Sequence, residues 1–211
     1  MKTISIGTQS SAAELATAFA NALAAEIGWT ADENGNVKKD GISVYFKFTV
    51  NSSTVSVTVS NGYATPTSGT SCAFSATNTY KLYILETAGG SIAVGVSAAT
   101  GTPNLGVLIV RNTAGTYSGI AQTGGTAYTV NTIRGIESAS SKLSLSTDTT
   151  AGVSTSIVKM PDIWGAAMFV DLYYVVSCPF SSLDRVFYIG GKNYRSVGTS
   201  GSRMYFALPE E

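Results

Sequence analysis

Three aspartates in the last quarter of the chain have the side chain needed for acid–base chemistry. Asp162, Asp171 and Asp184 lie near aromatic residues in the sequence. Glycoside hydrolysis requires two carboxyl groups about 5 to 10 Å apart, and neighbouring aromatic rings could stack on the sugar. However, residues alternate around Asp171 as on a strand with one apolar face and one outward face, which suits a solvated acid. We therefore expect no catalytic residue and no enzyme.

A second motif has the spacing of a serine nucleophile with a lysine base. Ser156 and Lys159 match Ser-x-x-Lys, which penicillin-recognising enzymes place on a helix. The Ser-Asp-Asn and Lys-Thr-Gly partners of that motif are missing, and the flanking residues have an extended pattern. In a strand, residues three apart lie on opposite faces, so we expect no nucleophile at Ser156.

Histidine is absent from the chain, which excludes Ser-His-Asp and Cys-His catalysis and every histidine-based metal site. Cys72 and Cys178 form no Cys-x-x-Cys motif. We expect two partly buried thiols rather than a disulfide, as in a protein made in a reducing cytosol. No cofactor or metal is predicted.

Residues 32–36, Asp-Glu-Asn-Gly-Asn, resemble the start of a calcium loop because oxygen-bearing side chains alternate. The EF-hand pattern then fails, since Val37 stands where glycine is required and Ser43 where the bidentate glutamate is required. The Asn-Gly pair instead predicts a polar hairpin turn.

Four aromatic residues of the C-terminal strands could form a binding platform. A tyrosine or tryptophan ring offers an apolar face together with a polar atom, which suits a sugar or a receptor surface. This interpretation requires exposed rings at Trp164, Tyr173, Tyr188 and Tyr194.

The composition is unusual in charge rather than in hydrophobicity. Apolar residues make up 44% of the 211 positions, but charged residues only 12%, against about 25% in an average soluble domain. Serine and threonine together fill about a quarter of the chain. The formal net charge is zero, so the chain lacks the basic field that nucleic acid binding requires. No nucleic acid partner is expected.

A surface rich in hydroxyl groups can be buried against identical copies of the chain without burying unpaired charges. The composition therefore favours a subunit of a symmetric homo-oligomer. An extracellular adhesin or sugar-binding sandwich remains an alternative, because such proteins also have hydroxyl-rich surfaces.

One helix is predicted over residues 12–27. Ser11 and Glu14 form a capping box, and Gly28 occupies the C-terminal position that favours a left-handed conformation. Leucine, phenylalanine and isoleucine recur every four residues along one stripe, as on an amphipathic helix: Leu15, Phe19, Leu23 and Ile27.

After Gly28 the hydrophobic period changes to two, which indicates strands joined by short turns. We predict a mainly β, α+β fold, an antiparallel β-sandwich or barrel with one N-terminal amphipathic helix. Residues 1–60 would hold the helix and β-hairpins. Residues 61–78 have turn composition and would form a loop or linker, and residues 79–211 would form the antiparallel sandwich.

The first ten residues lack the apolar core of a signal peptide. The longest apolar run, residues 165–176, is interrupted by Asp171 and falls short of the roughly twenty residues of a membrane helix. We expect no secretion by the general pathway and no membrane insertion.

The chain resembles the small structural proteins of tailed bacteriophages in its serine-, threonine- and glycine-rich β segments. The resemblance is carried by ISIGTQSSAAELATAFANAL, GWTADENGNV and FYIGGKNYRSVGTSGSRMYFAL. It implies a virion component of the tail, baseplate or neck that is synthesised in the host cytoplasm and binds copies of itself and other virion proteins. It assigns no functional residue. The alternative is a carbohydrate- or receptor-binding sandwich at a phage tail tip, with a host-surface glycan as ligand, or on a cell surface.

Overall fold

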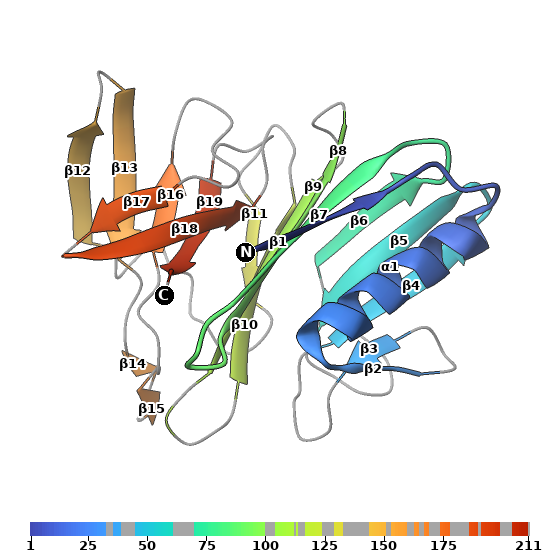
Figure 1. Cartoon of the computed structure of the whole chain (residues 1–211), viewed down its shortest axis with the longest axis horizontal. Coiled ribbons are helices and arrows are strands. Elements are labelled where there is room, and N and C mark those ends of the chain that lie inside the picture. The colour runs from blue at the N-terminus through green and yellow to red at the C-terminus, as the bar shows by residue number, and fades with distance from the viewer. Residues whose placement is uncertain are drawn as a thin grey trace.

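A computed structural model describes residues 1–32, 36–38, 45–60, 70–99, 104–111, 113, 117–123, 129–132, 144–150, 153–159, 163–164, 167–168, 174–177, 186–189, 191–198 and 204–210. These residues form one helix and four antiparallel sheets (Figure 1). The prediction of a mainly β chain with antiparallel sheets in a sandwich-like arrangement and one N-terminal helix is confirmed.

Helix α1 spans Ala12–Ile27, the range predicted from the sequence. The Ser11 hydroxyl accepts a hydrogen bond from the Glu14 N–H at 3.2 Å, and the Glu14 carboxylate accepts one from the Ser10 N–H at 3.1 Å. This is close to a capping box, with the difference that Glu14 accepts from the N–H of Ser10, the residue before the N-cap, and not from that of Ser11 itself. Gly28 ends the helix with φ of 65°, a left-handed conformation that glycine adopts without strain. The four residues of the apolar stripe are all buried.

The helix lies along a five-stranded sheet, hereafter the helix-side sheet (Figure 1). Its strands follow chain order as β2 (Thr30–Ala31), β3 (Asn36–Lys38), β4 (Tyr45–Asn51), β5 (Thr54–Ser60) and β6 (Thr70–Ser75). The β-hairpins expected within residues 1–60 are present as β2–β3 and β4–β5. The predicted loop over residues 61–78 is wrong for residues 70–75, which pair with β5. Residues 61–69 lie outside the described residues.

A six-stranded sheet, hereafter the central sheet, has the order β1-β7-β8-β9-β10-β11. Strands β7 to β11 follow chain order as an antiparallel meander, in line with the antiparallel strands expected after residue 79. The strands are β1 (Lys2–Ile6), β7 (Tyr80–Glu86), β8 (Ile92–Ala98), β9 (Asn104–Arg111), β10 (Tyr117–Thr123) and β11 (Thr129–Thr132).

Strand β1 was not predicted, and it connects the two parts that the sequence was expected to keep separate. It pairs with β7, with Ile4 opposite Leu82. One cluster of buried side chains also includes residues from α1, the helix-side sheet and the central sheet. The expected boundary at residues 61–78 therefore does not separate two hydrophobic cores.

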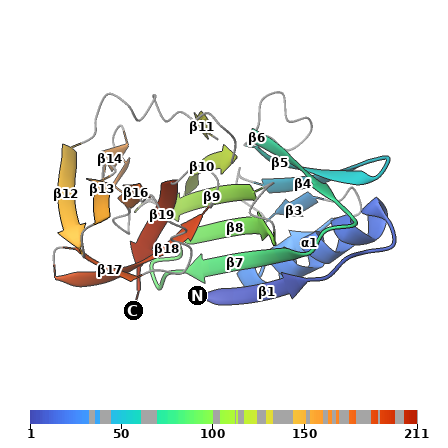
Figure 2. The same ribbon diagram turned by 90° about the horizontal axis from the view of Figure 1, so that it is seen from above.

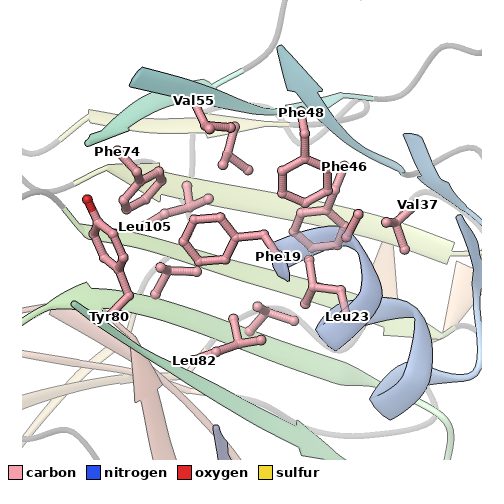
Figure 3. Packing of buried hydrophobic residues seen from close by; sticks show 14 of the residues in the cluster. Phe19, Leu23, Val37, Phe46, Phe48, Val55, Phe74, Tyr80, Leu82 and Leu105 are labelled. Carbon is pink, nitrogen blue, oxygen red and sulfur yellow. The ribbon is translucent and has the colours of Figure 1, made fainter. Parts of the chain in front are cut away.

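Phe19 lies at the middle of this cluster, between the two sheets (Figure 3). Its ring centroid is 5.4 Å from that of Phe74, 5.5 Å from that of Tyr80 and 6.2 Å from that of Phe48. These distances are typical of favourable aromatic pairs. Phe19 thereby joins the helix to strands of both sheets.

The other face of the central sheet has a different composition. Leu85, Ala93 and Leu108 form a row across β7, β8 and β9 and are buried. The next row contains two neighbouring glycines, Gly95 and Gly106, which leave the middle of this face without side chains.

A third sheet, hereafter the C-terminal sheet, covers this second face. Its order is β12-β13-β16-β19-β18-β17, and its strands lie away from α1 (Figure 2). Strand β18 comes within 8 Å, between Cα atoms, of β7, β8 and β9 together, so it crosses a face of the central sheet. This approach is closer than the spacing of about 10 Å usual between packed sheets. The bounds are β12 (Ser144–Thr150), β13 (Val153–Lys159), β16 (Tyr174–Ser177), β17 (Val186–Ile189), β18 (Lys192–Gly198) and β19 (Met204–Pro209).

A separate two-stranded sheet consists of β14 (Ile163–Trp164) and β15 (Ala167–Met168).

Candidate interaction surface

The four aromatic residues of the expected binding platform do not form one surface among the described residues. The Tyr188 side chain is exposed, as predicted, at 70%. Tyr194 is only 3% exposed, so the prediction that its ring is available to a ligand is wrong. The reason is that β18, which carries Tyr194, is covered by the central sheet. Phe187, not Tyr188, is the cross-strand partner of Tyr194, so the two tyrosines belong to opposite faces of the hairpin.

Trp164 lies in β14 and pairs with Ala167 of β15. That two-stranded sheet shares no strand pairing with β17 or β18 in the described residues. Tyr173 lies outside the described residues. Tyr188 is thus the one member of the predicted platform that the described structure places as an exposed ring.

The residues considered for catalysis are only partly described. Asp162, Asp171 and Asp184 lie outside the described residues. Ser156 and Lys159 lie in β13, so the Ser-x-x-Lys spacing is on a strand, as expected, and lacks the helical geometry that the motif uses. In the part of the chain that the structure describes, no group of three or more Cys, Asp or Glu residues is placed to hold a metal ion.

Asp32 and Asn36, the two ends of the calcium-like segment, are described, and residues 33–35 between them lie outside the described residues. The Asp32 carboxylate accepts hydrogen bonds from the Asn36 backbone N–H at 2.9 Å and from the Asn36 side-chain amide at 3.1 Å. Lys38 Nζ lies 3.6 Å from the same carboxylate. These contacts join the two strands of the β2–β3 hairpin at its closed end.

Cys72 lies in β6 as a buried thiol, 9% exposed. Cys178 is outside the described residues.

The strongest candidate surface is the outer edge of β17, hereafter the β17 edge, formed by Val186–Ile189. Among the described residues, the large hydrophobic side chains that are exposed are Val50, Val186 and Tyr188. Two of these three lie on β17, two residues apart and therefore on one face. Among the described strands, β17 is the last of its sheet, with no described strand paired to its outer side. An apolar pair thus lies beside an open strand edge.

The backbone of β17 presents its hydrogen-bonding groups to this open side. Asn193, the cross-strand partner of Tyr188, accepts a hydrogen bond from the Glu210 N–H at its carbonyl oxygen. Its backbone groups therefore point towards β19 and away from β17, which makes Tyr188 and Asn193 a non-hydrogen-bonded pair. The N–H and C=O of Tyr188 point outwards as a result. The N–H and C=O of Val186, two residues earlier, also point outwards.

The β17–β18 hairpin that carries this edge is held to the end of β19 by an ion pair. Arg195 Nε donates to Glu210 Oε1 at 2.6 Å, and the two side chains are about one quarter exposed. Arg195 is the cross-strand partner of Val186. The guanidinium charge next to the apolar pair is therefore already matched by a carboxylate of this chain. Lys192, at the start of β18, is exposed.

The edge of the central sheet differs from the β17 edge. Strand β1 exposes Lys2, Thr3 and Ser5, and Lys2 forms an ion pair with Glu26. A charged lysine on an edge strand disfavours pairing with another chain. The β17 edge has no such protection, since its four residues are Val, Phe, Tyr and Ile.

A second surface lies along the outer side of α1. An open depression there is lined by Gln9, Ala13, Glu14, Thr17, Ala18 and Asn21. Its one carboxylate, that of Glu14, caps the helix. The side chains are small or uncharged apart from Glu14, so this face illustrates the charge-poor exterior that the composition predicted.

No helix among the described residues is long and apolar enough to cross a membrane. Comparison with protein-family models, with curated proteins and with solved structures found no match.

Proposed function

We propose that this protein is a non-enzymatic structural subunit of a bacteriophage particle, in the tail, baseplate or neck. It would act by associating with itself and with neighbouring virion proteins. The observation that carries the proposal is the β17 edge, which combines open backbone groups with two exposed apolar side chains. Exposed patches and unprotected edges of this kind are typical of surfaces that bind other proteins.

The composition supports the same function. With 12% charged residues and a net charge of zero, identical copies would neither repel one another nor bury many unpaired ions on contact. The outer face of α1 has this character in the described structure. The assignment to a virion rests on the resemblance of the glycine- and hydroxyl-rich segments to phage structural proteins.

A carbohydrate- or receptor-binding module is the alternative, and the exposed ring of Tyr188 favours it. A platform that stacks on sugar generally needs a flat exposed aromatic surface. Burial of Tyr194 removes one of its four expected members.

Light scattering of the purified protein over a range of concentrations tests the assembly function. We expect species larger than the 21.8 kDa chain, increasing with concentration. A monomer at every concentration contradicts self-association. In that case a glycan array distinguishes the alternative, because a specific signal lost in Tyr188→Ala would support a sugar-binding module.

The genes that flank the gene for this chain test the virion assignment separately. We expect them to encode tail, baseplate or neck proteins. Flanking genes for a cell-surface or metabolic system would contradict the assignment.

A further inference from the structure

We propose that the β17 edge pairs antiparallel with the β17 edge of a second copy of this chain. The pairing would join two C-terminal sheets into one continuous sheet across a two-fold axis. This inference rests on the proposed function, because it names the contact through which self-association would occur.

The backbone geometry of β17 is complementary to itself. Val186 and Tyr188 are the residues whose N–H and C=O groups point to the open side. If the two-fold axis passes at Phe187, Val186 of one copy lies opposite Tyr188 of the second copy, and the reverse pair forms by symmetry. Each of these is then a hydrogen-bonded pair, which exchanges both of its N–H···O bonds. A two-fold contact of this kind is the commonest in homo-oligomers.

The side chains of the same two residues support this register. Both are about half exposed or more, with Val186 at 47% and Tyr188 at 70%. In the proposed pairing each valine lies directly across from a tyrosine of the second copy. Aromatic and β-branched residues in direct cross-strand positions stabilise antiparallel pairs. Water would be removed from both apolar side chains in each copy.

The charges near the β17 edge favour a second copy of this chain as its binding partner. The four residues of β17 carry no charge, so an identical strand brings no like charges opposite one another. The nearby guanidinium of Arg195 is matched within the chain by Glu210, and the net charge of the chain is zero. The edge strand β1, by contrast, would bring Lys2 into any contact between copies.

The contact is small. A pairing of two four-residue strands buries less than the roughly 1,200 Å² found at the lower limit of stable interfaces. We therefore expect a weak dimer that depends on concentration, and a tighter assembly where several copies are held together in a particle.

Sedimentation velocity of three variants tests the contact. Tyr188→Pro removes an N–H that points to the open side and leaves the hydrogen bonds between β17 and β18 intact, since proline is tolerated on edge strands. Val186→Lys places a charge on the apolar pair. Val50→Lys is the matched control, because Val50 is a valine with 48% exposure on β4, far from this edge in the fold. Circular dichroism and melting temperature verify that each variant is folded.

We expect Tyr188→Pro and Val186→Lys each to weaken the dimer at least tenfold, an increase in Kd equivalent to about 1.4 kcal/mol or more. Val50→Lys should leave it unchanged. Hydrogen exchange gives an independent measurement on the unmodified chain. The amides of Val186 and Tyr188 should exchange more slowly as protein concentration rises.

Two results overturn the inference and are distinguishable. If the protein associates but neither β17 variant weakens association, and the two amides exchange at a rate independent of concentration, then the contact is elsewhere and the proposed function is retained. If the unmodified protein is monomeric at all concentrations, both the inference and the proposed function are wrong.

Discussion

The two faces of the central sheet are buried by different means. On the first face, large side chains such as Leu82, Val94 and Val107 belong to the buried cluster that also contains Phe19 of α1 and residues of the helix-side sheet. On the second face, Ala93 and the glycines Gly95 and Gly106 leave space, and β18 approaches closely. The same strands therefore provide a side-chain-filled core on one side and a close backbone contact on the other.

On the second face, small residues let the strands approach closely beside the buried side chains of Leu85 and Leu108. Where the side chains are small, the backbones of the two sheets lie close enough to exclude water. Ser97 of β8 and Ser196 of β18 are buried. Opposite substitutions should therefore destabilise the two faces. Removing side-chain volume should destabilise the first face, and adding side-chain volume should destabilise the second.

The largest effect is expected for Phe19→Ala on the first face. The side chain is 1% exposed and contacts three aromatic rings from both sheets. Loss of a buried phenylalanine side chain typically lowers the free energy of unfolding by about 3 to 5 kcal/mol. Chemical denaturation measures this. Thr17→Ala, an exposed change on the same helix, should stay within about 0.5 kcal/mol of the unmodified protein. Equal effects for the two variants would contradict the central position of Phe19.

A smaller effect, of opposite volume change, is expected for Ala93→Leu on the second face. Ala93 is fully buried in a row between Leu85 and Leu108. Extra carbon atoms in a packed site usually cost about 1 to 3 kcal/mol in the free energy of unfolding. Ala73→Leu is the matched control, because Ala73 is an exposed alanine on β6. If Ala93→Leu were as harmless as the control, β18 would not be packed closely on this face.

The effect of pH on Tyr80 is confined to alkaline conditions. Burial raises the pKa of Tyr80 above its ordinary value of 10.0, and its hydroxyl donates to the Ser75 carbonyl at 2.8 Å. Since the folded pKa exceeds the unfolded one, the neutral ring stabilises the fold below pH 10, and this contribution is lost as pH rises towards the folded pKa. Unfolding free energies of the unmodified protein and of Tyr80→Phe should therefore converge above pH 10. Parallel pH curves for the two would contradict the shift.

Local signals in the sequence predicted much of the fold. The helix limits followed from Ser11, Glu14 and Gly28, because caps act within one turn of the chain. The hairpins followed from alternation and from short turns. Because these signals depend only on residues close together in the sequence, they predict local structure before the tertiary fold is known.

The missed strands depend on partners distant in sequence. Strand β1 has five residues with apolar side chains at Ile4 and Ile6, a pattern too short to distinguish from a loop before β7 is known to lie beside it. In β6, Cys72 and Phe74 alternate with smaller residues, but their segment contains enough turn-forming residues to mask that period.

The candidate site could be predicted only in part, for the same reason. The predicted platform required exposed rings at both Tyr188 and Tyr194, and the structure exposes Tyr188 but not Tyr194. The sequence could not show that β18 would be covered by the central sheet and that Tyr194 would be buried with it. Val186 was overlooked because valine carries no chemical motif, although its spacing of two from Tyr188 and the following Gly-Gly pair together mark an apolar hairpin edge.

The pairing of β1 with β7 has a consequence for how the protein is made. A ribosome releases β1 and α1 long before it has synthesised β7, so until then β1 lacks its partner strand and the apolar stripe of α1 is covered only by the helix-side sheet. Contacts between segments distant in sequence slow folding and prolong the exposure of apolar surface that promotes aggregation. Productive folding in the cell would therefore depend on the speed of translation through the central strands and on access to chaperones.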